Sequence, residues 1–189
     1  FLGEGHAYNC NGSIRFEWTN NNEDIVRDYV TLTRKLFGIK IKKNNNPEKV
    51  KYYFDSNGIG RFFKKLCMPI KMDAYNKRLP GLIFKCPKTE IYSFLQAYLD
   101  CDGGVGKAGL HVTTASEELS TQVHMLLQNL GITSFKNETY SIATNGIMAQ
   151  KQLYHQISIY ADELVKLSTH VKFKCKYKQN NMQLLKLIG

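Results

Sequence analysis

The sequence predicts an α+β fold built from two similar halves with antiparallel sheets. An internal repeat is the first indication: residues 1–5 and residues 95–103 each join an apolar stretch to a small residue, an acid and a glycine. Each copy then precedes a strand pattern of alternating apolar and polar residues and an amphipathic helix pattern. The spacing between the two acids, Glu4 and Asp102, is close to the spacing between the helix-capping residues Asn22 and Ser116 that follow them.

The first half contains one helix with clear boundary signals. A strand is predicted at residues 13–19, because apolar and polar residues alternate there. Asn22 is a typical N-cap, and Gly38 is a typical residue for ending a helix. Further elements are predicted in chain order: strands at 39–42 and 50–54, and a short helix at 59–66.

The second half repeats this order after a helix of its own. Apolar residues from Ile91 to Leu99 recur at helical spacing, so a helix with one buried face is predicted at residues 90–102. Further elements are predicted in chain order: a strand at 110–114, a helix between Ser116 and Gly131, strands at 132–136 and 154–159, and a short helix at 162–167. A proline-containing segment joins the halves, which predicts domains at residues 1–80 and 81–189.

The composition indicates a polyanionic partner. The chain has 189 residues, and 26 Lys and Arg against 16 Asp and Glu give a formal net charge of +10. Nucleic acid or an anionic membrane surface would suit this charge, although charge can also serve solubility alone. We expect an intracellular protein without a membrane span, because the sequence shows neither a signal peptide nor an apolar run of about 18 residues. The five cysteines have no metal-ligand spacing, which favours reduced thiols.

The two acids of the repeat are candidate metal ligands. Ala97 and Cys101 are small and four residues apart, so a partner segment could approach the helix closely there. If Gly3 lies opposite Cys101, Glu4 and Asp102 emerge side by side. Like charges at short range are relieved by a divalent cation, and carboxylate oxygens favour Mg²⁺ or Ca²⁺. The alternative is that Asp102 and the glycine after it form an ordinary turn.

These residues resemble the LAGLIDADG homing endonucleases, in the two-motif, single-chain form found within inteins and some introns. Residues 95–103 match the nine-residue signature, with Gln96 and Tyr98 as departures. Residues 1–5 match the end of the first signature, and residues 75–80 are similar to the linker before the second motif. The resemblance implies a monomer with two αββαββα-type halves. In this fold, saddle-shaped sheets cover double-stranded DNA, and the motif helices pair at the centre.

The resemblance also implies a catalytic site. Glu4 and Asp102 would bind Mg²⁺, for which Mn²⁺ could substitute, assisted by the carbonyls of Gly3 and Cys101. Lys77 matches the first of two basic residues that the family uses near its metals. The second is expected within residues 171–178, where four lysines leave the choice open and Lys174 is favoured.

The implied activity is Mg²⁺-dependent cleavage of both DNA strands at a long asymmetric site by the endonuclease region of an intein, next to a splicing domain. A DNA-binding module that has lost cleavage, and an RNA maturase that assists intron splicing, are alternatives within the same family. Outward-facing strand positions are expected to contact DNA, because side chains on every second residue share a face. The predicted contacts are Arg15, Glu17, Thr19, Lys40, Lys42, Lys51, His111, Thr113 and Lys136.

Overall fold

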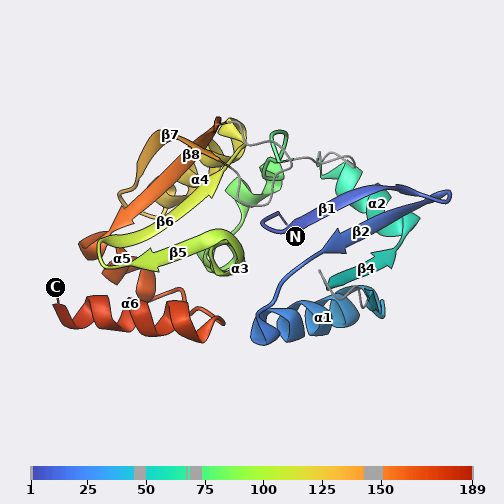
Figure 1. Ribbon diagram of the computed structural model, residues 1–189, viewed down its shortest axis with the longest axis horizontal. Helices are drawn as coiled ribbons and strands as arrows, with labels where there is room; N and C mark the ends of the chain where they lie inside the picture. Colours follow the sequence, from blue (N-terminus) through green and yellow to red (C-terminus); the bar gives the residue numbers. More distant parts are fainter. Residues whose placement is uncertain (1, 45–49, 67, 69–73, 143–150, 189) are drawn as a thin grey trace.

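A computed structural model describes residues 2–44, 50–66, 68, 74–142 and 151–188. The chain forms two halves that lie side by side (Figure 1). In chain order the first half contains β1 (Gly5–Cys10), β2 (Ser13–Trp18), α1 (Glu23–Phe37), β3 (Lys42–Asn44), β4 (Lys51–Asp55) and α2 (Asn57–Lys65). The elements from β2 to α2 follow the predicted order, and β1 was not predicted.

The second half begins with a short 3₁₀ helix, η1 (Gly81–Lys85), and a long helix, α3 (Lys88–Asp102). It continues with β5 (Gly103–Gly106), β6 (Gly109–Thr114), α4 (Glu117–Asn129), β7 (Phe135–Ile142), β8 (Lys151–Tyr160), α5 (Ala161–Ser168) and α6 (Lys176–Ile188).

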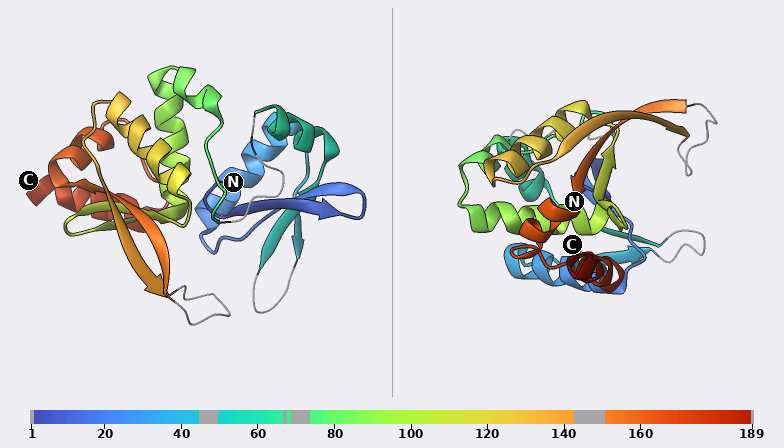
Figure 2. Two further views of the ribbon diagram at one scale, coloured as in Figure 1. Left: turned by 90° about the horizontal axis from the view of Figure 1, so that it is seen from above. Right: turned by 90° about the vertical axis from the view of Figure 1, so that its left-hand side faces the viewer.

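The two sheets have the same topology, which confirms the predicted repeat. Both are four-stranded and antiparallel, in the orders β1-β2-β4-β3 and β5-β6-β8-β7. Helices α2, α3 and α4 lie on one side of the sheets, and the strand pair β7–β8 extends away from them (Figure 2). The fold is therefore α+β with two similar halves, as the sequence predicts.

The predicted capping residues hold the helices of both halves. The side-chain oxygen of Asn22 accepts hydrogen bonds from the main-chain N–H groups of Asp24 and Ile25, and Gly38 ends α1 in the left-handed region. At the start of α4, Ser116 accepts a hydrogen bond from the N–H of Leu119. These bonds satisfy N–H groups that the first helical turn leaves unpaired, and so they fix where each helix begins.

The main hydrophobic core belongs to the second half, and it extends to the start of the chain. Leu95 and Leu99 of α3 are fully buried in it, and Leu2 is part of the same cluster. A smaller core forms around Phe16 and Phe54 in the first half. The turn that contains Leu2 therefore packs against the other half, which brings the two motif copies together.

Two predicted strands begin later than expected. β3 starts at Lys42 instead of residue 39, and β7 starts at Phe135 instead of residue 132. In the first half, Ile39 packs against the small core from a loop, and Ile132 is buried in the equivalent loop of the second half. Apolar residues that follow a helix can therefore bury themselves before the strand starts.

Helix α6 was missed by the sequence reasoning. Four lysines alternate between residues 172 and 178, and this pattern hides the start of a helix at Lys176. The helical signal comes later, because Met182 and Leu185 are three residues apart and both buried. No helix among the described residues has the length and apolarity needed to cross a membrane.

Candidate metal and nucleic-acid site

The two acids of the repeat lie at the junction of the halves. Glu4 ends the turn before β1, and Asp102 is the last residue of α3. A Cβ atom at Gly3 would lie 2.7 Å from the Cβ of Cys101 and 3.0 Å from Oδ1 of Asp102, so only glycine allows this approach without a shift. The expected pairing of Gly3 with Cys101 is confirmed. The metal-binding role of the acids stays a prediction.

The surroundings of the acids favour the protonated form of each. Burial raises the pKa of Glu4, a hydrogen bond from Asn20 opposes this effect, and the nearby charge of Asp102 adds to the rise. Burial also raises the pKa of Asp102, against the lowering effect of the Lys77 and Lys178 charges. The site is thus short of positive charge when both acids are ionised.

Asn20 holds Glu4 from the loop between β2 and α1. Its side-chain Nδ2 donates a hydrogen bond of 2.6 Å to Oε2 of Glu4. Its Oδ1 accepts a 2.6 Å hydrogen bond from the N–H of Asn22, the cap of α1. The sequence reasoning missed Asn20, because three consecutive asparagines before a helix carry no signal beyond capping.

Lys77, in the segment between the halves, contacts the turn that contains Gly3 and Glu4. Its Nζ donates a hydrogen bond to the carbonyl of Gly3. Burial lowers the pKa of Lys77, and the charges of Asp102 and Glu4 oppose this shift. The carbonyl of Lys77 accepts a 2.6 Å hydrogen bond from the hydroxyl of Ser116, which ties this segment to the start of α4.

Lys178 binds main-chain carbonyls of the last turn of α3, which contains Asp102, as Lys77 binds the carbonyl beside Glu4. From the first turn of α6, its Nζ donates hydrogen bonds to the carbonyls of Leu99, at 3.0 Å, and of Asp100. Lys174 points elsewhere, since its Nζ lies 3.8 Å from Oδ1 of Asp28. Of the four candidate lysines, the structure therefore brings Lys178 to the acids in place of Lys174. The helical spacing of Lys178, Met182 and Leu185 is the signal that could have found it.

Side chains from the rest of the fold do not enlarge the donor set. Among the described residues, no group of three or more His, Cys, Asp and Glu side chains is arranged to hold a metal ion. The available donors are two carboxylates and main-chain carbonyls, which are hard oxygen ligands. Mg²⁺ usually keeps several waters and binds one or two carboxylates together with substrate phosphates. The residues present fit such an ion.

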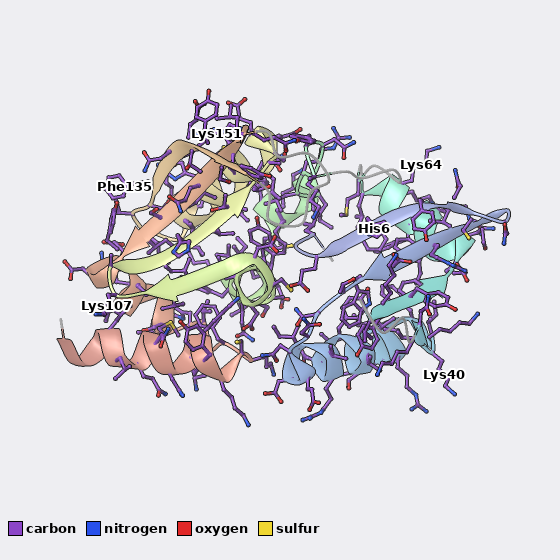
Figure 3. All side chains as sticks on the ribbon, viewed as in Figure 1. His6, Lys40, Lys64, Lys107, Phe135 and Lys151 are labelled. Atoms are coloured by element: carbon purple, nitrogen blue, oxygen red, sulfur yellow. The ribbon has the colours of Figure 1, made fainter. Side chains whose placement is uncertain are left out.

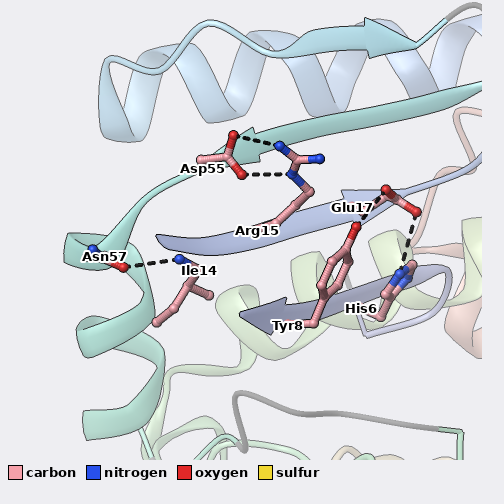
Figure 4. A network of polar contacts seen from close by, with 7 residues as sticks. All are labelled: His6, Tyr8, Ile14, Arg15, Glu17, Asp55 and Asn57. Carbon is pink, nitrogen blue, oxygen red and sulfur yellow. Dashed lines mark hydrogen bonds and ion pairs between the residues drawn. The ribbon is translucent and has the colours of Figure 1, made fainter. Parts of the chain in front are cut away.

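Four of the predicted DNA contacts share the polar face of the first sheet. The register pairs Arg15 with Asp55, Glu17 with Tyr53, and Tyr53 with Lys42, and Lys51 follows on the same face of β4. Glu17 is buried beneath its neighbours. His6 lies 3.5 Å from its Oε1, and the Tyr8 hydroxyl donates to its Oε2 (Figure 4). The Nζ of Lys51 lies 2.8 Å from the same Oε1. Glu17 therefore lies on the predicted face, but its side chain is covered by these neighbours.

In the second sheet, His111 and Thr113 are exposed, as predicted, on the face they share with Ser158 and Gln156. Lys136 lies on the opposite face, where its Nζ donates a hydrogen bond to Thr121 of α4 and lies 3.6 Å from Glu117. The outward placement of Lys136 is wrong, because Lys136 pairs with Ile157 of β8, which is fully buried on the helix-covered face.

The remaining two predicted contacts lie outside the strands. Thr19 and Lys40 are in the loops that flank α1, and Lys40 is exposed at the outer end of the first half (Figure 3). Exposed positions also surround the second sheet, where Figure 3 marks Lys107 at the β5–β6 turn and Phe135 at the start of β7.

Known proteins share both the sequence pattern and the fold. The family model of the LAGLIDADG-like domain matches residues 89–172. A structure of variants of the homing endonuclease I-DmoI superposes with a TM-score of 0.61, covering 90% of this chain and 91% of that one at 14% identity. Residues 89–172 of the chain therefore form a LAGLIDADG-like domain. A second LAGLIDADG structure, I-DmoI in complex with DNA and Mn, gives a TM-score of 0.60 at 13% identity, with 90% of each chain covered.

The curated relatives of this chain are named as proteins of different kinds. It is 34% identical over 134 residues to a replication factor C small subunit of Methanocaldococcus jannaschii, a match that covers 70% of this chain and 7% of the relative. It is 28% identical over 178 residues to a DNA polymerase of Thermococcus aggregans, covering 87% of this chain and 9% of the relative. The chain thus spans less than a tenth of each of these two relatives.

Proposed function

We propose that this protein is a sequence-specific DNA endonuclease that depends on a divalent cation. One observation carries the proposal: two partly buried acids from equivalent positions of the repeat lie near each other where the halves join, and a lysine binds the main chain beside each acid. The repeat thus supplies one acid from each half to a single site, and a lysine accompanies each acid.

The acids and the main chain would hold the cation. Glu4 and Asp102 are its proposed ligands, with the carbonyls of Gly3 and Cys101 nearby, and Mg²⁺ is the proposed ion, for which Mn²⁺ could substitute. When bound, such an ion lowers the pKa of a water and neutralises charge on a phosphate. Asn20 fixes the direction of the Glu4 carboxylate through its 2.6 Å hydrogen bond.

The two lysines are proposed to stabilise the negative charge that develops on the cleaved phosphate. Lys77 and Lys178 each hold an ammonium group beside one acidic turn, and their main-chain contacts limit its movement. Burial lowers the pKa of Lys77, which makes proton donation to a leaving oxygen easier than from an exposed lysine. Within the four-lysine segment we assign the second basic position to Lys178.

The relatives support an intein context. The matched segment occupies small parts of a replication factor C subunit, a DNA polymerase and a probable translation initiation factor. These proteins have different functions, so a shared segment is typical of an inserted element. We therefore propose that the chain is the endonuclease region of an intein, with a splicing domain beside it.

The test is cleavage of the host gene without the insertion. Plasmid DNA with the uninterrupted gene should be cut on both strands with Mg²⁺ or Mn²⁺, and chelation of the metal should stop cleavage. Glu4→Gln and Asp102→Asn should each lower the rate by at least about 100-fold, because each removes a charged ligand, while DNA binding in Ca²⁺ remains. Asp162→Asn, an exposed position in α5, is the matched control and should cut at the wild-type rate.

Other outcomes would identify the alternatives. Tight sequence-specific binding without cutting by the wild type would indicate a binding module. Rescue of intron splicing without DNA cleavage would indicate a maturase. Unchanged cleavage by both acid variants would contradict the proposed site.

A further inference from the structure

Arg15 differs from the other basic residues of the first sheet in how firmly it is held. Its Nε and Nη2 donate hydrogen bonds of 2.8 Å and 3.1 Å to the two carboxylate oxygens of Asp55 (Figure 4). The carbon at the centre of the guanidinium lies 4.4 Å from the centre of the Tyr53 ring. Two planar contacts therefore fix both the position and the orientation of the group.

This arrangement leaves one edge of the guanidinium unused by Asp55. The carboxylate binds the Nε–Nη2 side, and the Tyr8 hydroxyl is a further hydrogen-bond partner of the guanidinium. The outer edge formed by Nη1 and Nη2 still carries N–H donors that Asp55 does not take. The Arg15 side chain keeps 26% of its exposure despite the ion pair. An arginine edge with two parallel donors matches the O6 and N7 acceptors of guanine in the major groove.

Glu17, the neighbouring acid of β2, has no oxygen left for a base. Both oxygens of Glu17 are engaged, by Lys51 and His6 on one side and by the Tyr8 hydroxyl on the other. With 8% of its side chain exposed, Glu17 cannot accept a hydrogen bond from a base without breaking this network. Its role on this face is to hold its neighbours in place.

The register locates Arg15 relative to the paired acids. Arg15 pairs with Tyr8 of β1, and Tyr8 is four residues beyond Glu4. At about 3.3 Å per residue this is roughly 13 Å along the strand, and at about 3.4 Å per nucleotide it corresponds to roughly four base pairs.

We infer that Arg15, oriented by Asp55 and Tyr53, selects a guanine in the half-site covered by the first sheet, and that Glu17 selects no base. The inference rests on the proposed function, since it assigns one base of the target. The guanine should lie roughly four base pairs from the nearer cleaved phosphate, on the side bound by the first half.

The experiment is selection from a randomised DNA duplex library with Ca²⁺, so that binding is measured without cutting. The wild type should enrich one sequence, with guanine at the position described. Arg15→Ala should lose the preference for guanine at this one position by about 5- to 150-fold, the range for a bidentate base contact. Asp55→Asn, which keeps the shape of the partner, should weaken the same preference without abolishing it.

Two control variants separate base reading from folding or general charge. Arg61→Ala removes an exposed arginine from α2, on the helical side of the sheet, and should leave every base preference unchanged. Glu17→Gln should keep the guanine preference of the wild type. Thermal melting of each variant identifies loss of folding, and Asp55→Asn still tests the inference if Arg15→Ala does not fold.

The outcomes distinguish this inference from the function on which it rests. If the wild type enriches no sequence, the proposed function fails and the base assignment fails with it. If the wild type enriches a sequence but Arg15→Ala and Asp55→Asn retain every preference, the Arg15 assignment alone is overturned. A new base preference in Glu17→Gln would overturn the role given to Glu17.

Discussion

At the scale of single residues, two lysines make equivalent contacts from unrelated parts of the chain. Lys77 lies between the halves and Lys178 in the last helix, yet each donates hydrogen bonds to main-chain carbonyls beside an acid. Their positive charges lower the pKa of Asp102 against the larger, opposite effect of burial. Each lysine thus makes the ionised form of that acid easier to reach.

Replacing these lysines distinguishes the two candidates in the four-lysine segment. Lys178→Met should lower the cleavage rate by about 10²-fold or more, since it removes a charge at the acids. Lys174→Met should change the rate less than about fivefold, because the Nζ of Lys174 lies beside Asp28 and the surface pair is worth at most about 1 kcal/mol. Single-turnover cleavage at saturating enzyme is the measurement. The reverse order of effects would assign the basic role to Lys174, as the sequence alone favours.

At the scale of elements, α3 ends in an arrangement that its own residues do not stabilise. Its last turn contains Asp100 and Asp102 and no basic residue, although the C-terminus of a helix favours positive charge. Lys178 supplies that charge from α6 by binding carbonyls of this turn. Asp100 in return accepts hydrogen bonds from the N–H groups of Lys174 and Cys175, at 2.9 Å and 3.1 Å, just before α6. The two helices therefore compensate for each other.

Ser116 links a helix start to the position of Lys77. It caps α4 through the N–H of Leu119 and donates to the carbonyl of Lys77. Ser116→Ala should lower the free energy of unfolding by about 1–2 kcal/mol, because a cap and a buried hydrogen bond are both lost. Ser93→Ala, which removes a bond on the exposed side of α3, should cost less than about 0.5 kcal/mol. Urea unfolding curves measure both values, and equal values would contradict the linking role.

At the scale of the whole molecule, the two sheets offer different surfaces to a partner. In the first sheet, most charged side chains pair with each other, as Arg15 does with Asp55 and Glu17 with Lys51. In the second, His111 and Thr113 are exposed beside Ser158 and Gln156. The first surface presents groups in fixed orientations, and the second presents smaller polar groups that can adjust to a base pair.

The net charge of +10 predicts binding that weakens steeply with salt. A protein that neutralises six to ten phosphates loses about 10³- to 10⁵-fold in affinity between 50 and 200 mM salt. We expect a loss in this range for the selected duplex in Ca²⁺, measured by fluorescence anisotropy in KCl. An affinity that changes less than about tenfold would show that basic residues contribute little to DNA contact.

Particular residues show how far the sequence could be interpreted. Asn22, Gly38 and Ser116 were predicted correctly, because capping depends on local hydrogen bonds that one residue type makes within a few positions. Lys136 was assigned to the wrong face, because it pairs with the buried Ile157 of β8. Glu17 lies on the predicted face, but neighbours on adjacent strands bury its side chain. Strand starts and cross-strand partners depend on contacts distant in sequence.

The sequence by itself determined the repeat, the two acids and the order of the strands and α-helices apart from β1, β5 and α6, because periodicity, capping and motif spacing are local properties of the chain. The tertiary structure decided which groups surround those acids. Asn20 and Asp55 carry no local signal, and the spacing of Lys178 indicates a helix but not its partner. All three matter because folding brings α6 to α3, the β2–α1 loop to Glu4, and β4 to Arg15. A polar group acts through its neighbours in space, and pairing between strands and helices far apart in the chain sets those neighbours.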